Sequence, residues 1–382
     1  MASGSRNRRV GRTLLGVLLG VVAALAIMPL LESAKAKQDG TEVGPILSDC
    51  DGSLREIVIH YSGEDGETVF PVYCDFLAVL PADVTVRVVA PGRAVFDELV
   101  SAVGEVACTL KPVIVDHEIT SWSRDRWIAL GPAKDRLDTT LVAPRGEMGA
   151  EIWPGRKGDE RVAEELAETL IDTAFLRSGL WFDGGDFVAD SETVFVTPNV
   201  LRRNLQVTVK TRDELVTRLK RLLGRKVVLL DDAPDHHAGM FMMAVGGRTV
   251  LVGDPRAAKG LIDGDGSALL PGGADFSEET AAKFDAVAKQ CEAAGYRVVR
   301  IPLAAGVDGR TFVTSLNAIL ETRGGRRIVY MPTVSGAELL NAAAREVWEG
   351  LGYDVRPVDC TSSYRMFGSL RCLVNVASRS EF

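Results

Sequence analysis

One cysteine near the C-terminus lies in a setting that can make it a nucleophile. Cys372 falls within residues 368–375, which read Gly-Ser-Leu-Arg-Cys-Leu-Val-Asn. A glycine turn followed by an apolar strand can hold a thiol at the mouth of a pocket, and a neighbouring histidine or cation converts that thiol to the reactive thiolate. Free cysteines are also among the most buried residues, so the remaining chain must supply such partners before Cys372 becomes a catalytic candidate.

Three further polar segments each follow a predicted strand. They are residues 121–127 (Ser-Trp-Ser-Arg-Asp-Arg-Trp), 182–186 (Phe-Asp-Gly-Gly-Asp) and 231–237 (Asp-Asp-Ala-Pro-Asp-His-His). Each has a plain explanation on its own, such as an ion pair, a tight turn or a solvated histidine pair. Loops at the carboxyl ends of strands are where α/β folds build their sites. If these loops converge, they bring a histidine and several carboxylates to Cys372.

The elements that must position these loops form a repeat. Helices are predicted at 93–103, at 159–176, after a capping box at Thr211 and Glu214, at 277–295, and from a Ser335 and Glu338 capping box to Gly352. The strands predicted to follow them are 112–115, 180–182, 226–230, 297–303 and 354–358, and extra strands are predicted at 127–130, 139–143, 193–197, 249–253 and 370–376. Five helix–strand units at a period of about 50–70 residues indicate a circular or stacked α/β repeat. A generic α/β sandwich is the alternative.

The first fifty residues differ from the rest of the chain. Four arginines precede an apolar run over residues 13–31, and the small-residue pattern Ala-Lys-Ala ends at position 36. This order is typical of an export signal, and the run is also barely long enough for an uncleaved membrane anchor. We therefore predict a signal or anchor over 1–36, a linker over 37–50 and a single domain over 51–382, which would be periplasmic or secreted.

Composition restricts the class of partner. The chain has 382 residues, is 46% hydrophobic and 25% charged, and carries a formal net charge of -8. These values fit a globular protein with a sizeable core and argue against a nucleic-acid surface. Six cysteines are present, and an oxidising compartment would permit disulfides. Their spacing predicts neither a zinc site nor any other metal site.

Taken together, the motifs resemble those of a known superfamily. Residues 122–127, 182–186, 237–242 and 368–375 are similar to segments of the guanidine-modifying enzymes, the pentein superfamily. The resemblance covers most of residues 51–378 and is strongest to the branch of agmatine deiminases and bacterial peptidylarginine deiminases. It implies a five-bladed α/β propeller, in agreement with the five units counted above.

The resemblance also implies roles for individual residues. Cys372 would attack the guanidinium carbon, His237 would act as general acid and base, and Asp125 and Asp183 would be the carboxylates of the site. Further substrate-binding candidates are Trp122, Arg124, Asp186, Asp235 and Arg371. A planar cation requires paired carboxylates, and a poor electrophile requires a strong nucleophile. This chemistry requires no metal and no cofactor.

Two positions depart from the deiminase pattern. Gly239 stands two residues after His237, where the deiminases usually carry a second aspartate, and Arg371 precedes Cys372 where many agmatine deiminases carry histidine. Leaving guanidinium N–H groups unpaired in a closed site costs several kcal/mol. Three interpretations follow: Asp235 or Asp232 substitutes, the substrate is N-alkylated and has fewer N–H groups, or the protein binds a ligand without turning it over.

The resulting hypothesis is an exported cysteine hydrolase of guanidino groups. Export favours an arginine-containing peptide or arginine derivative over agmatine, which is mainly an intracellular metabolite. Two alternatives remain open: a non-catalytic ligand-binding protein on the same scaffold, and an amidinotransferase that uses the same covalent intermediate. The N-terminal segment predicts a further partner, a membrane.

Overall fold

A computed structural model describes residues 43–64, 66–132, 139–147 and 154–380. They belong to one compact unit that begins at Val43. Residues 43–50, which we predicted to be a linker, are therefore part of the folded unit, and Ile46 pairs with Leu130. The predicted export segment and its apolar run lie outside the described residues. Within the described ranges, no helix has the length and apolar character needed to cross a membrane.

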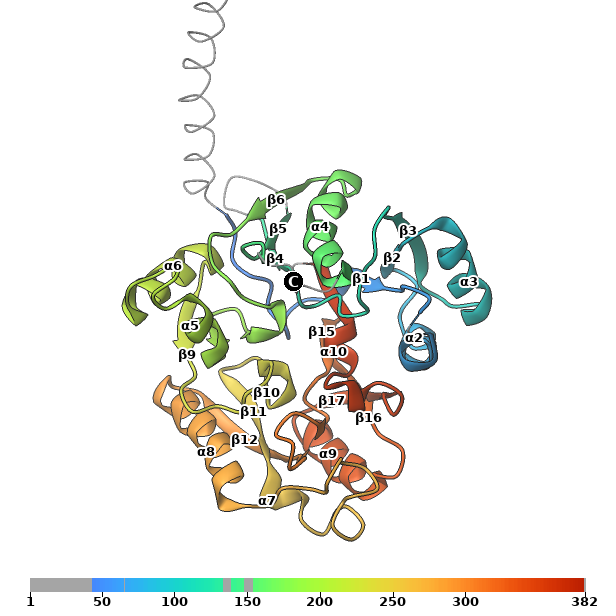
Figure 1. The fold of residues 1–382 in the computed structure, drawn as a ribbon. Coiled ribbons are helices and arrows are strands. Elements are labelled where there is room, and N and C mark those ends of the chain that lie inside the picture. Colours follow the sequence, from blue (N-terminus) through green and yellow to red (C-terminus); the bar gives the residue numbers. More distant parts are fainter. Residues whose placement is uncertain (1–42, 65, 133–138, 148–153, 381–382) are drawn as a thin grey trace, which may run out of the picture. The chain divides into compact units, whose positions relative to one another are not determined.

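Five sheets in the described part of the chain share one strand order (Figure 1). In each of them, an antiparallel pair of strands is extended by a third strand that runs parallel to the second. The sheets are β4(Ile128–Leu130)-β5(Thr139–Ala143)-β6(Thr173–Arg177), β7(Phe187–Ala189)-β8(Thr193–Val196)-β9(Lys226–Leu229), β10(Met242–Ala244)-β11(Thr249–Asp254)-β12(Arg297–Pro302), β15(Ile319–Arg323)-β16(Arg326–Thr333)-β17(Tyr353–Asp359) and β18(Val374–Arg379)-β1(Leu54–His60)-β2(Thr85–Ala90)-β3(Thr109–Ile114). A two-stranded sheet, β13(Ala304–Ala305)-β14(Phe312–Val313), adds to these.

Helices connect the two parallel strands of each sheet, as a parallel connection requires. The connecting helices are α2 (Gly66–Ala78), α4 (Pro154–Thr169), the pair α5 (Pro198–Asn204) and α6 (Arg212–Leu223), the pair α7 (Pro255–Ala258) and α8 (Glu278–Ala293), and α9 (Glu338–Gly350). An additional helix, α3 (Arg93–Val103), joins β2 to β3. The pairing of β18 with β1 joins the last described strand to the first. The structure therefore has an α/β fold built from repeated units, and the arrangement of the sheets as blades about one axis stays a prediction.

Local signals explain the helices that we predicted correctly. Thr211 accepts a hydrogen bond from the Glu214 backbone N–H at the start of α6, and Gly224 adopts the left-handed conformation at its end. Ser277 caps α8 in the same way. These caps satisfy the unpaired backbone groups of the helix ends, and the buried Leu215 and Leu219 anchor α6 to its sheet.

Three element predictions were wrong. The helix predicted over 159–176 ends at Thr169, because the chain turns at Asp172, with φ at 54°, and residues 173–177 form β6 beside β5. The predicted strand 180–182 is consequently a loop. The residue that precedes α9 is Ala337, so Ser335 does not cap this helix.

The first repeat unit was also misplaced. The helix and strand that we counted first are α3 and β3, which extend the edge of a sheet. The actual first unit is β1, α2 and β2, and α2 contains Pro71, a residue that argues against a helix interior. The predicted strand 370–376 is likewise divided: α10 (Leu370–Leu373) precedes β18, so Cys372 lies on a short helix.

Candidate active site

Cys372 is held in place by the segments that surround α10. The Asn317 side-chain oxygen accepts hydrogen bonds from the Cys372 backbone N–H at 3.2 Å and from the Ser369 hydroxyl at 3.1 Å. The Arg124 backbone N–H donates to the Cys372 carbonyl at 3.3 Å. The residue is only 4% exposed, and the Cys372 thiol is close enough to the His237 imidazole to raise its pKa. The thiol therefore faces a histidine rather than hydrocarbon alone.

The two adjacent histidines have different roles. His237 immediately precedes the 3₁₀ turn η2 (Ala238–Met240), and its backbone N–H donates to Nδ1 of His236 at 2.8 Å. Burial, together with the positive charges of His237 and Arg310, lowers the pKa of His236 to about 3. His236 is therefore a neutral acceptor that orients the backbone of His237, which leaves His237 for the chemistry.

His237 lies between two carboxylates. Its Nδ1 is 3.9 Å from Oδ1 of Asp125, and its Nε2 is 3.9 Å from Oδ2 of Asp183. Burial lowers the pKa of His237, but Asp125, Asp183 and the Cys372 thiol outweigh burial and raise it well above the ordinary value. The imidazole is consequently protonated at neutral pH and can donate a proton.

The glycine pair before Asp186 allows these loops to approach one another. Gly184 and Gly185 form the 3₁₀ turn η1 (Gly184–Asp186). A Cβ at position 185 would lie 2.4 Å from Nδ1 of His237, and one at position 184 would lie 2.2 Å from the Arg124 carbonyl oxygen. Only glycine fits at these close contacts, so the pair does more than form a tight turn.

Three arginines surround Asp183. Its Oδ1 accepts hydrogen bonds from Arg126 at 3.0 Å and Arg156 at 2.8 Å, and its Oδ2 accepts one from Arg203 at 2.9 Å. Glu147 accepts from Arg126 at 3.0 Å and from Arg203 at 2.8 Å. Burial raises the pKa of Asp183, but the neighbouring His237 and the arginines lower it to a net value below the ordinary one. Asp183 is therefore ionised throughout the neutral range.

Asp125 is a less stable anion than Asp183. It is buried, and its Oδ1 has no hydrogen-bond partner among the described residues. Burial raises the pKa of Asp125 to about 6; the neighbouring Asp183 adds to this effect, while His237 and Arg156 oppose it. A buried acceptor oxygen without a partner, 3.9 Å from a histidine nitrogen, is suited to an incoming N–H donor.

Comparison with known proteins shows which solved structures share the fold of this chain. No protein-family model and no curated protein sequence matches the chain. Among solved structures, agmatine deiminase from C. jejuni matches 88% of this chain and 96% of its own, with 15% identity and a TM-score of 0.65. A protein named as a candidate peptidyl-arginine deiminase matches 90% of this chain and 100% of its own, with 13% identity and a TM-score of 0.66. A candidate arginine deiminase from Porphyromonas gingivalis matches 86% of this chain and 96% of its own, with 20% identity and a TM-score of 0.65.

The chain has the fold of the agmatine deiminases.

Within this agmatine deiminase fold, the surroundings of Gly239 are cationic. A Cβ at position 239 would lie 3.0 Å from Nη1 of Arg371 and 3.3 Å from the Asn317 amide nitrogen. Arg371 is 2% exposed and donates to Asp49 at 2.9 Å, and Arg124 lies 3.9 Å from the same carboxylate. The space beside the missing carboxylate therefore holds a guanidinium, whose counter-ion Asp49 comes from the segment that we predicted to be a linker.

The remaining predicted residues divide into two groups. The Trp122 ring lies against Gly368 and borders Cys372, since a Cβ at Gly368 would approach both residues. Asp186 is fully engaged in the turn, where it accepts from the Asp183 backbone N–H at 2.9 Å and from Thr197 at 2.6 Å. We therefore correct the assignment of Asp186 from substrate binding to structure.

The acids proposed to substitute at position 239 do not do so. The Asp235 side chain is 76% exposed and pairs with Arg202. Asp232 is exposed at a turn with φ at 53°. Both are therefore surface groups, and the prediction that Asp235 supplies the missing acid is corrected.

Sequence reasoning missed part of the site. Arg126 was inside a quoted motif but was given no role. Arg156 and Arg203 carried no signal because Asp183, the acid they share, lies 20 or more residues from each of them. Asn317 was missed for the same reason, since it holds Cys372 across 55 residues. Only the folded chain reveals these contacts.

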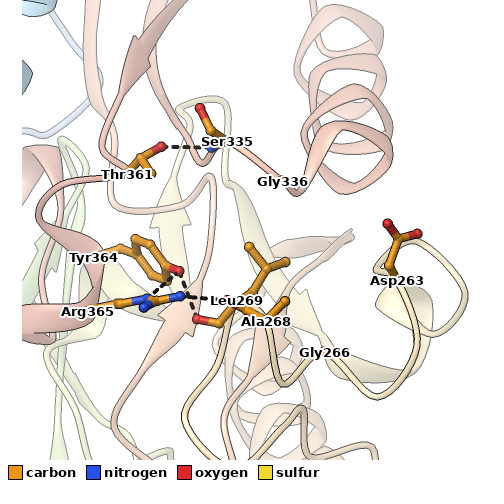
Figure 2. Close-up of a pocket in the computed structure, with 9 residues that line it drawn as sticks. All are labelled: Asp263, Gly266, Ala268, Leu269, Ser335, Gly336, Thr361, Tyr364 and Arg365. Atoms are coloured by element: carbon orange, nitrogen blue, oxygen red, sulfur yellow. Dashed lines mark hydrogen bonds between the residues drawn. The ribbon is translucent and has the colours of Figure 1, made fainter.

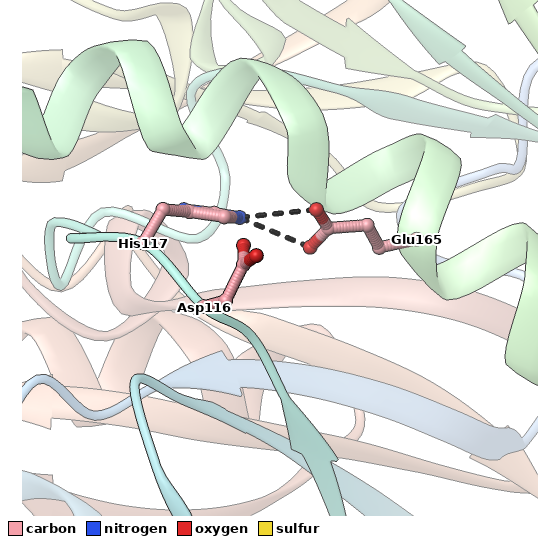
Figure 3. Close-up of side chains that lie close together, drawn as sticks. All are labelled: Asp116, His117 and Glu165. Atoms are coloured by element: carbon pink, nitrogen blue, oxygen red, sulfur yellow. Dashed lines mark hydrogen bonds and ion pairs between the residues drawn. The ribbon is translucent and has the colours of Figure 1, made fainter.

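One cluster among the described residues has the composition of a metal site. Asp116, His117 and Glu165 place their ligand atoms within 4.8 Å of one another (Figure 3). Nε2 of His117 lies 3.0 Å from Glu165, and Arg161 already pairs with Glu165 at 2.8 Å and with Asp116 at 3.0 Å. Arg161 therefore pairs with both carboxylates of the cluster and offsets part of their charge.

A surface pocket of about 490 Å³ is lined in part by Leu269, Tyr364 and Arg365 (Figure 2). The Tyr364 hydroxyl donates to the Leu269 carbonyl at 2.8 Å. None of the residues that line this pocket is a site candidate from the sequence, so we assign it no part in the chemistry.

Proposed function

We propose that this protein is an exported cysteine hydrolase of guanidino groups, acting on an arginine-containing peptide or an arginine derivative. The observation that supports the proposal best is the position of the His237 imidazole between Asp125 and Asp183, at 3.9 Å from each, with the Cys372 thiol near enough to raise the His237 pKa. A nucleophile, an acid–base group and two carboxylates are the parts that this reaction needs. The named neighbours, deiminases of agmatine, arginine and peptidyl-arginine, support a guanidino substrate.

In the first half of the reaction, the carboxylates bind the substrate guanidinium, and the sulfur of Cys372, as the thiolate, attacks its carbon. Asp125 offers the oxygen that has no partner among the described residues. The C–S bond forms, one C–N bond breaks, and the departing amine takes a proton from the His237 imidazolium. The raised pKa of His237 suits it to this donation.

In the second half, His237 is neutral and accepts a proton from water. The resulting hydroxide attacks the carbon of the thiouronium intermediate, the C–S bond breaks and the thiolate returns. In sum, a guanidino group and one water yield a ureido group and one ammonia. The two halves use one histidine in opposite directions, which microscopic reversibility allows.

The finer parts of the proposal concern arrangement and location. We place the five similar sheets as five blades about one axis, with the loops that carry Asp125, Asp183, His237 and Cys372 meeting at its centre. The basic and apolar N-terminal segment supports export, either as a cleaved signal or as a membrane anchor over residues 13–31.

A specific observation favours a second candidate, a ligand-binding protein without turnover. Arg371 lies beside Gly239, where the resemblance leads us to expect a carboxylate. A cation there repels a second guanidinium instead of binding it.

An amidinotransferase is the other alternative. It differs from the hydrolase only in the amine that replaces water as the second nucleophile, and access of water to the covalent intermediate decides between the two reactions.

A haloamidine thiol probe separates turnover chemistry from binding. We expect 2-chloroacetamidine to label Cys372 in the full chain and to leave Cys372→Ala unlabelled, because the probe needs both a thiolate and an acidic clamp. Intact-mass spectrometry reads the label, and ammonia and citrulline assays on arginine peptides, arginine and agmatine identify the substrate. Absence of labelling at every pH between about 5 and 9 would reject the hydrolase and favour the binding protein.

A further inference from the structure

Arg156 is the one arginine among the described residues that contacts both carboxylates of the proposed clamp. It lies in the first turn of α4, and its side chain is 26% exposed. Nη1 donates to Oδ2 of Asp125 at 3.3 Å, and Nη2 donates to Oδ1 of Asp183 at 2.8 Å. A single planar guanidinium therefore bridges two acids that come from different loops.

The oxygens that Arg156 uses differ from those that face the histidine. His237 approaches Oδ1 of Asp125 and Oδ2 of Asp183, each at 3.9 Å. Arg156 takes the other oxygen of each carboxylate. The oxygen of Asp125 that it leaves is the buried one without a hydrogen-bond partner in the described ranges. Arg156 thus occupies one side of the pair and leaves the side toward His237 free.

The other arginines of the cluster do not share this geometry. Arg203 donates to Asp183 and to Glu147, and Arg126 donates to Asp183, Glu147 and Glu160. Neither has a contact with Asp125 in the described structure. Arg203 is therefore a natural control, since its side chain is 28% exposed and it touches the same Asp183 carboxylate.

We infer that Arg156 is a positioning residue: its guanidinium fixes the carboxylates of Asp125 and Asp183 and directs the free oxygen of Asp125 toward His237 for the substrate. The inference rests on the proposed function and goes beyond it, because it names a built-in cation as the group that orients the clamp. The fork geometry matters, since a planar guanidinium can bridge two carboxylates at fixed spacing and an ammonium cannot.

Charges around Asp125 determine how the inference is tested. His237 and Arg156 favour its ionised form, and Asp183 and Asp159 disfavour it. Burial lowers the pKa of Arg156, but Asp183, Asp125 and Glu147 raise it more. The net pKa of Arg156 therefore lies above the ordinary value, and the group stays charged. Removing this charge leaves the two acids facing one another with less compensation. Asp125 then ionises only at higher pH.

The test measures labelling of Cys372 by 2-chloroacetamidine against pH in the full-length protein. We expect Arg156→Gln to move the midpoint of the rising limb upward by about one pH unit and to slow labelling at pH 6 about tenfold. Arg156→Lys should show a smaller shift, and it replaces the glutamine variant if that one does not fold. Arg203→Gln should shift the midpoint less than Arg156→Gln does, because Arg203 contacts Asp183 but makes no ion pair with Asp125 in the described structure.

Two results would overturn the inference. If Arg156→Gln is labelled at pH 6 as fast as the unchanged protein or faster, the Arg156 guanidinium does not help to position the two carboxylates. If Arg203→Gln shifts the midpoint of labelling equally, the effect comes from the loss of any nearby positive charge and not from the contact of Arg156 with Asp125. Titration of the Asp125 carboxyl by ¹³C NMR gives a readout without activity. If the unchanged protein is never labelled, the proposed function fails, and an unshifted Asp125 titration in Arg156→Gln would separately reject the role of Arg156.

Discussion

At the scale of single residues, Asp125 shows how burial and charge oppose each other. Burial and the Asp183 charge raise its pKa to about 6, and His237 and Arg156 counteract part of that rise. An acid with a raised folded-state pKa favours folding most when protonated, so its ionisation costs stability as the pH rises toward 6. The protein accepts this cost at a position where the anion can bind a guanidinium.

The pH dependence of turnover should report this acid. We expect kcat/KM for an arginine peptide to rise with pH with a midpoint near 6, because only the ionised Asp125 accepts N–H donors. Asp125→Asn should abolish the rise of kcat/KM near pH 6 and reduce turnover by about 10²–10³-fold. Ammonia release between pH 5 and 9 measures both effects. Asp235→Asn, an exposed aspartate, is the control, and an equal loss in that variant would contradict the assignment.

At the scale of elements, two 3₁₀ turns bring the acid and the base together. η1 follows Asp183 and η2 follows His237, and the absence of a side chain at Gly185 allows the imidazole to pack against η1. Neither turn is a regular helix or strand. Their placement depends on the strands β7 and β10 that follow them, so a small local change displaces Asp183 or His237.

A methyl group at Gly185 should therefore disable the site without unfolding the protein. Gly185→Ala places a Cβ 2.4 Å from Nδ1 of His237, and a displacement of about 1 Å can reduce a rate by about 10²-fold. Gly179→Ala is the matched control, since no atom lies within 4 Å of its Cβ position. Steady-state kinetics and circular dichroism together test this expectation. Full activity in Gly185→Ala would show that His237 can move without cost.

Among the helices and strands, some could be predicted from the sequence and others could not. Helices α6 and α8 carry caps and buried stripes within their own residues, so periodicity located them correctly. In contrast, α2 contains Pro71, and β6 is a strand because it pairs with β5, which no local pattern records. Motif positions of Asp125, Asp183, His237 and Cys372 could be read directly. The contacts of Arg156 and Asp49 could not, because ion pairs between distant segments exist only after folding.

At the scale of the whole molecule, the segment before β1 completes the charge balance around the nucleophile. Asp49 is half-buried and lies between Arg371 and Arg124. Burial raises the pKa of Asp49, but the two arginines lower it to a net value below the ordinary one. Because the folded-state pKa is lowered, the stabilising contribution is complete above about pH 4 and is lost as the pH falls further.

Removing this counter-ion should destabilise the protein. We expect Asp49→Ala to lower the free energy of unfolding by about 3–5 kcal/mol at pH 7, because two buried guanidinium groups lose their shared anion. Asp51→Ala should cost about 1 kcal/mol, since it removes one hydrogen bond from Ser48 at 2.7 Å. Urea unfolding measures both. A loss for Asp49→Ala no larger than that for Asp51→Ala would mean that the arginines find other partners.

The pairing of β18 with β1 also bears on when the proposed site can form. During synthesis, β1 emerges well before β18, the strand with which it pairs. The helical turn that bears Cys372 directly precedes β18. A nascent chain that has not yet reached this stretch therefore lacks both the sulfur and the closing strand, so the proposed chemistry requires that most of the fold has already been translated.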